Sequence, residues 1–81
     1  MSWRYCIIRR TKRQNRKVLH FYEIREVYFD VKNRIIGWSN APVELISESV
    51  NELRWDLSMM LADSFRMPVF EERKGKLVPR K

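Results

Sequence analysis

The sequence predicts an α+β fold in which a three-stranded antiparallel β-meander carries one long C-terminal α-helix packed on one face. Three observations support this strand–strand–strand–helix order. Aromatic and apolar residues alternate over residues 3–8, and aromatic and β-branched residues dominate residues 18–29. An apolar stripe with a period near 3.6 then follows Ser49. With 81 residues, the chain suits one small domain with a thin core.

The first two strands are expected to be joined by a solvated loop. Residues 11–17 contain no apolar side chain, so we predict that they form this loop between the strands at 3–8 and 18–29. Residues 35–39 are predicted as a third short strand, which Pro42 ends because proline cannot donate a ladder hydrogen bond.

The helix has the clearest signals in the sequence. Ser49 and Glu52 have the spacing of a capping box, and Pro68 stops the helical pattern. We predict that the apolar stripe packs on the sheet, so that Leu57→Ala costs about 2–5 kcal/mol of stability. The stripe consists of Val50, Leu53, Leu57, Met60, Leu61 and Ser64.

Charge divides the chain into a mildly acidic body and two basic extremities. The chain has 17 Lys and Arg against 10 Asp and Glu. Residues 9–17 hold six bases and residues 73–81 hold five, with no acid in either stretch. Without these eleven bases the remainder carries a net charge of −4. We therefore predict a single α+β domain over residues 1–72 and a basic, disordered tail over 73–81.

Two interpretations of the basic segments stay open. They contact a polyanion, or they are solvated extremities that keep the chain soluble. In the first case, the segment at 9–17 makes the chain a nucleic-acid-binding protein, with the tail as a second contact. The candidate residues are Arg9, Arg10, Lys12, Arg13, Arg16 and Lys17.

Several motifs resemble those of a group of small uncharacterised bacterial proteins. These are a W-x-Y start at Trp3, a Y-x-I-x-E-V-Y-x-D strand from Tyr22, G-W-S from Gly37, and an E-S-x-x-E-L helix start at Glu48. The match covers about residues 3–72, and its motifs are mainly structural. More distantly, the element order is similar to small antitoxin modules of the HicB type. That resemblance implies a sheet and a helix that precede a separate DNA-binding segment.

No group of residues in the sequence predicts catalysis. Cys6 and His20 are the single thiol and imidazole, and we interpret Cys6 as a half-buried strand residue rather than a nucleophile. One Cys and one His do not supply the ligands of a metal site. Glu23 and Glu26 have opposite parity on a regular strand, so they diverge. Glu71 and Glu72 are a second candidate pair of carboxylates. We expect no enzyme, cofactor or metal.

The primary functional hypothesis is a non-enzymatic binding or interaction module. Trp55, Met59 and Ala62 form a second strip on the helix, which predicts a homodimer or an unidentified protein partner. Nucleic-acid binding is the alternative. Aromatic residues of the sheet are expected either to form the core or to stack on bases. They are Tyr5, Tyr22, Tyr28 and Trp38.

A cytoplasmic location is expected from the single cysteine, because small secreted domains usually need disulfides. The sequence has no apolar run that approaches the length of a membrane span, so no membrane contact is predicted.

Overall fold

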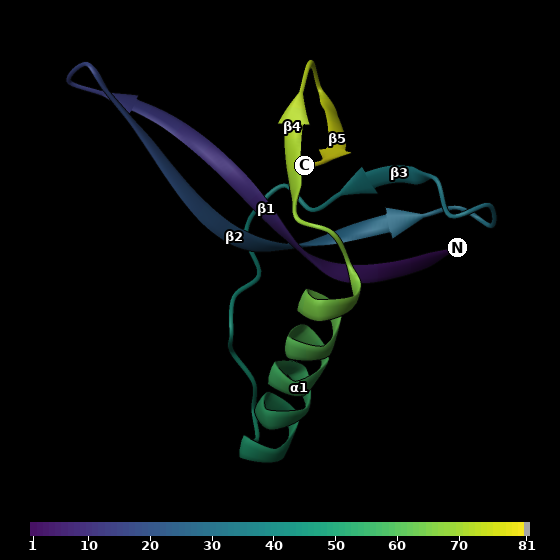
Figure 1. The fold of residues 1–81 in the computed structure, drawn as a ribbon. Helices are drawn as coiled ribbons and strands as arrows, with labels where there is room; N and C mark the ends of the chain where they lie inside the picture. Colours follow the sequence, from purple (N-terminus) through teal and green to yellow (C-terminus); the bar gives the residue numbers. More distant parts are fainter. Residues whose placement is uncertain (81) are drawn as a thin grey trace.

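A long, twisted β-hairpin dominates the computed structural model, which describes residues 1–80 (Figure 1). Strand β1 (Ser2–Gln14) pairs antiparallel with β2 (Lys17–Phe29) along its whole length. The turn residues Asn15 and Arg16 both have positive φ angles, 50° and 68°. Such a two-residue turn matches the twist of the two strands. The polar residues predicted as a loop therefore extend the ladder, and that prediction was wrong.

Three short strands and one helix make up the rest of the regular structure within residues 1–80. Strand β3 (Ile35–Trp38) pairs antiparallel with β2, and helix α1 (Val50–Arg66) follows. Strand β4 (Phe70–Arg73) pairs parallel with β1, and β5 (Lys76–Pro79) pairs antiparallel with β4. The described residues thus form a five-stranded mixed sheet in the order β3-β2-β1-β4-β5.

The predicted three-stranded meander with a C-terminal helix is therefore wrong. The helix lies between β3 and β4, and two further strands follow it. Residues 73–80, predicted as part of a disordered tail, belong mostly to the β4–β5 hairpin, whereas Lys81 lies outside the described residues. Lys74 and Gly75 form its turn, both with positive φ, and Gly75 adopts such a φ without a steric penalty.

The core lies on one face of this sheet. Its most completely buried large residues are Ile8 and Val27, and the edge strands β3 and β5 line a common hollow of about 370 Å³. The sheet thus curls so that its own strands cover its apolar face, without the helix. The buried cluster contains Cys6, Ile8, Val27, Phe29, Phe70 and Leu77, with Ile35, Trp38 and Met67 packed against it.

Helix α1 projects away from the sheet and meets it mainly at β1 (Figure 1). The predicted start is confirmed, because the Ser49 side chain accepts a hydrogen bond from the Glu52 N–H at 3.1 Å. The Glu52 carboxylate instead accepts from the Ser47 hydroxyl. The helix ends at Arg66, just before Pro68, as predicted. The predicted packing of its whole apolar stripe on the sheet is wrong: Met60 is buried where the helix meets β1, but Leu57 and Leu61 are exposed.

Candidate interaction surfaces

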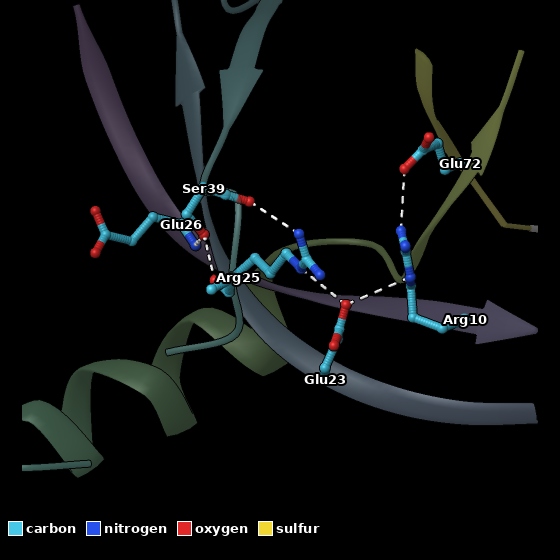
Figure 2. A network of polar contacts seen from close by, with 7 residues as sticks. Arg10, Glu23, Arg25, Glu26, Ser39 and Glu72 are labelled. Atoms are coloured by element: carbon cyan, nitrogen blue, oxygen red, sulfur yellow. Dashed lines mark hydrogen bonds and ion pairs between the residues drawn. The ribbon is translucent and has the colours of Figure 1, made fainter. Parts of the chain in front are cut away.

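An ion-pair network fastens the middle of the β1–β2 hairpin to its neighbours (Figure 2). The Arg10 guanidinium on β1 lies 3.5 Å from Glu23 on β2 and donates to Glu72 on β4 at 3.0 Å. Arg25 pairs with Glu23 at 2.7 Å and donates to the Ser39 carbonyl at 3.0 Å. These contacts join β1, β2, β4 and the end of β3, and they hold Arg10 among carboxylates rather than free for a ligand.

The carboxylates considered for catalysis do not converge. Glu26 points away from Glu23 (Figure 2). It accepts a hydrogen bond from the Tyr28 hydroxyl at 3.1 Å. This hydrogen bond raises the pKa of Tyr28. On β4, Glu71 pairs with Arg73 at 2.8 Å, whereas Glu72 accepts from Arg10. Each of these carboxylates therefore forms an ion pair with a neighbouring arginine or accepts a hydrogen bond from a neighbouring side chain.

Cys6 and His20 lie far apart along the hairpin. Cys6 is opposite Arg25, whereas His20 is opposite Thr11, well toward the turn. Burial, with a contribution from Asp63, raises the pKa of the Cys6 thiol to about 12, so it is un-ionised near neutral pH. Its full burial goes beyond the predicted half-burial and separates it from a base.

The outer half of the hairpin is a free two-stranded ribbon, residues 10–21. The pairing of β1 with β4 reaches only Arg9, and β3 pairs with β2 only near its far end. All residues from Thr11 to Tyr22 are exposed. Four of the six predicted nucleic-acid contacts stand on this ribbon, exposed and without an ion pair among residues 1–80. These are Lys12, Arg13, Arg16 and Lys17.

Arg9, the remaining predicted contact, lies at the base of the ribbon. One of its terminal nitrogens is 2.7 Å from Nε2 of His20, and its buried Nε has no hydrogen-bond partner among the described residues. Arg9 lines a hollow of about 540 Å³ together with Arg73 and Arg80. Sequence reasoning missed this juxtaposition because it treated the C-terminal bases as a separate tail.

The second strand of the ribbon is apolar where the first is basic. Four large side chains of β2 in this region are substantially exposed, namely Val18, Leu19, Phe21 and Tyr22. The predicted aromatic face is consequently divided. Trp38 packs against the core, Tyr5 is half-buried with its pKa raised by burial and then by Asp56, and Tyr22 is exposed.

Helix α1 exposes half of the stripe that was predicted to be buried, whereas Leu53 and Ser64 are half-buried and Met60 is buried. Leu57 is 46% exposed and Leu61 62%, and Phe65 extends the stripe with 84% exposure. Met60 and Asp63 are the buried residues of the helix. The predicted large cost of Leu57→Ala through loss of core packing is therefore wrong, because this side chain is not part of the core. The exposed stripe contains Val50, Leu57, Leu61 and Phe65.

A buried carboxylate joins this helix to the sheet. Asp63 is 2% exposed, and its Oδ2 accepts a hydrogen bond from the backbone N–H of Tyr5 at 3.0 Å. This acceptor satisfies a donor of β1 just before the stretch in which β4 pairs with that strand. Sequence reasoning missed Asp63, because an acid within a helix ordinarily indicates a solvated position.

The predicted interface strip lies on another side of the helix. Trp55 is exposed, whereas Met59 and Ala62 are half-buried. At 100° per residue these three positions lie roughly opposite the exposed stripe. The helix therefore carries two separate apolar regions.

No protein-family model matches the chain, and no curated protein or solved structure matches it. The resemblance to small bacterial proteins and to HicB-type modules thus stays a prediction. Within residues 1–80, no three His, Cys, Asp or Glu side chains gather as a metal site requires. In the same residues, no helix has the length and apolar character needed to cross a membrane.

Proposed function

We propose that the chain is a non-enzymatic interaction module that self-associates through the exposed apolar stripe of α1. The observation that carries this proposal is the uncovered stripe itself, Val50, Leu57, Leu61 and Phe65, on a helix that projects from the sheet. Large apolar side chains gathered on one surface mark an interaction site, whereas scattered ones need no explanation.

The amount of exposed surface supports a second copy as the occupant. The accessible surface is 6789 Å² for a mass of 10.0 kDa. A folded monomer of that mass is expected to expose about 5,200 Å². The exposed ribbon and the exposed stripe of α1 both contribute to this excess, which is larger than the surface of about 800 Å² that each partner buries in a standard interface. The radius of gyration, 14.1 Å, likewise exceeds the value of about 12 Å expected for this length.

The stripe also suits contact with a copy of itself. In an antiparallel pair of helices centred between Leu57 and Leu61, Leu57 of one copy lies opposite Leu61 of the second copy, and Leu61 lies opposite Leu57. The same symmetry places Leu53 opposite Phe65. Apolar residues thus meet apolar residues at the central levels, as a two-fold interface requires, and the polar pair of Arg54 and Ser64 lies beside them. The antiparallel arrangement also opposes the two helix dipoles favourably.

Sedimentation velocity at tens of micromolar tests the proposal. Wild-type protein is expected to sediment as a dimer of about twice the monomer mass, and Leu61→Glu as a monomer, because a dry interface disfavours an unpaired charge. Arg66→Gln, which changes the net charge by the same amount at an exposed position on the opposite side of the helix, is the matched control and is expected to remain dimeric. Since Leu61 is exposed, circular dichroism should show both variants folded.

Two outcomes contradict this assignment. One is a wild-type monomer throughout the concentration range. The other is a dimer that Leu61→Glu leaves intact but Trp55→Ala dissociates, which would place the interface on the strip of Trp55, Met59 and Ala62. The proposal places the module in the cytoplasm, since its buried cysteine is a free thiol.

A further inference from the structure

We infer that the β1–β2 ribbon is a binding arm for the groove of duplex DNA. This inference goes beyond self-association and does not rest on it, because the outer part of the β1–β2 hairpin and helix α1 point in different directions (Figure 1). The inference rests on the charge, the two faces, the reach and the turn of the ribbon.

The charge of the ribbon has one sign only. Residues 10–21 hold five bases and no acid. Arg10 is held by Glu23 and Glu72, so its charge is largely compensated. The four remaining ribbon bases, Lys12, Arg13, Arg16 and Lys17, have no ion pair within the described chain and therefore present a concentrated positive potential.

The bases lie on both faces of the ribbon, which favours a groove over a flat surface. Successive strand residues point to opposite faces, so Lys12 and Arg13 project on opposite sides. Arg16 adds charge at the tip itself. A groove of DNA has a phosphate backbone along each wall, so a ribbon inserted in it meets phosphates on both faces. A membrane or a flat acidic protein would contact one face and leave the other unpaired.

The dimensions of the ribbon suit the major groove. The part of β1 from Arg10 to Gln14 lies beyond its pairing with β4. At about 3.3 Å per residue it reaches about 16 Å. The major groove is about 12 Å wide and about 8.5 Å deep, and it admits a two-stranded ribbon.

The turn places a charged residue at the tip of the ribbon, at a position where glycine would be more stable. Arg16 occupies the second turn position with φ of 68°, where glycine is preferred. The β4–β5 hairpin of the same chain has Gly75 at the equivalent position, with φ of 76°. Replacing Arg16 by Gly would create the favoured Asn-Gly turn, so the substitution separates stability from binding.

Fluorescence anisotropy with a 20-base-pair duplex of mixed sequence tests the inference on the full chain. Four phosphate contacts predict a log–log salt slope near −3.6, so affinity should fall about 150-fold between 50 and 200 mM salt. The double variant Lys12→Gln with Arg13→Gln is expected to reduce the slope to about −1.8. Lys32→Gln with Arg54→Gln removes the same charge at exposed positions outside the ribbon and should leave the slope unchanged.

Arg16→Gly gives the sharpest comparison. We expect a melting temperature equal to or above that of wild type, together with a slope shallower by about 0.9. Equal losses in the ribbon and control double variants would overturn the inference, since they would show diffuse attraction by net charge. Tighter binding of single-stranded DNA than of duplex would also overturn it. So would binding to anionic phosphatidylserine vesicles without duplex binding at 50 mM salt.

Discussion

Asp63 is expected to hold helix α1 against β1, and Asp63→Ala tests this role. The substitution removes the acceptor of the Tyr5 N–H and leaves that donor without its partner. A buried donor left unsatisfied costs about 1–3 kcal/mol. For a domain of this size, 1 kcal/mol corresponds to about 4–8 °C in Tm. The expected loss is therefore about 4–24 °C. Asp63→Asn retains a side-chain oxygen that can accept, so we expect it to lose less.

Urea unfolding and amide hydrogen exchange measure this effect. The free energy of unfolding should fall for Asp63→Ala, and the Tyr5 amide should exchange faster in this variant than in wild type. Glu44→Ala, at an exposed position before the helix, is the control and should change stability by less than about 0.5 kcal/mol. An Asp63→Ala variant with wild-type stability and an unchanged Tyr5 exchange rate would refute the role of this hydrogen bond.

Three further predictions follow from burial and titration. In dilute, monomeric protein, Ile8→Ala should lower the free energy of unfolding by about 2–5 kcal/mol, and Leu57→Ala by less than about 1 kcal/mol. Equal losses for the two variants in urea unfolding would contradict the observed core. Because the pKa of Cys6 is raised to about 12, stability should decline as pH rises above the ordinary thiol value of 9.0, and Cys6→Ala should abolish that part of the decline. Hydrogen bonds from Arg34 lower the pKa of Asp30, so its stabilisation should be lost as pH falls below 3.8, and Asp30→Asn should show a shallower acid dependence; identical acid profiles would contradict this.

The elements that depend on local sequence were predictable, whereas those that depend on tertiary contacts were not. The start of the helix at Ser49 follows from its own cap, and the strands near Ile8 and Val27 follow from their composition. The polar run 11–14 gave no strand signal, because its strand conformation comes from pairing with β2 rather than from side-chain burial. Gly75 was a turn signal, but the surrounding bases indicated a tail.

The candidate surfaces were predicted in part. The basic residues of 9–17 were identified from charge, but their placement on both faces of a ribbon required the strand pairing. The sequence correctly predicted which apolar residues share a face of the helix. The prediction that this chain's own sheet buries that face was wrong. Periodicity shows which residues share a face, but it does not show what covers that face. Here the sheet covers itself, and the stripe around Leu57 and Leu61 is left exposed.

The central claim is that this stripe meets its counterpart on a second copy. An isotope-filtered NOE experiment on an equimolar mixture of ¹³C-labelled and unlabelled protein, at several hundred micromolar, tests it most directly. We predict intermolecular cross-peaks between the methyl groups of Leu57 and those of Leu61, and between Leu53 and the ring of Phe65. A spectrum with no intermolecular cross-peaks, or with cross-peaks confined to the Trp55 indole, would contradict the claim.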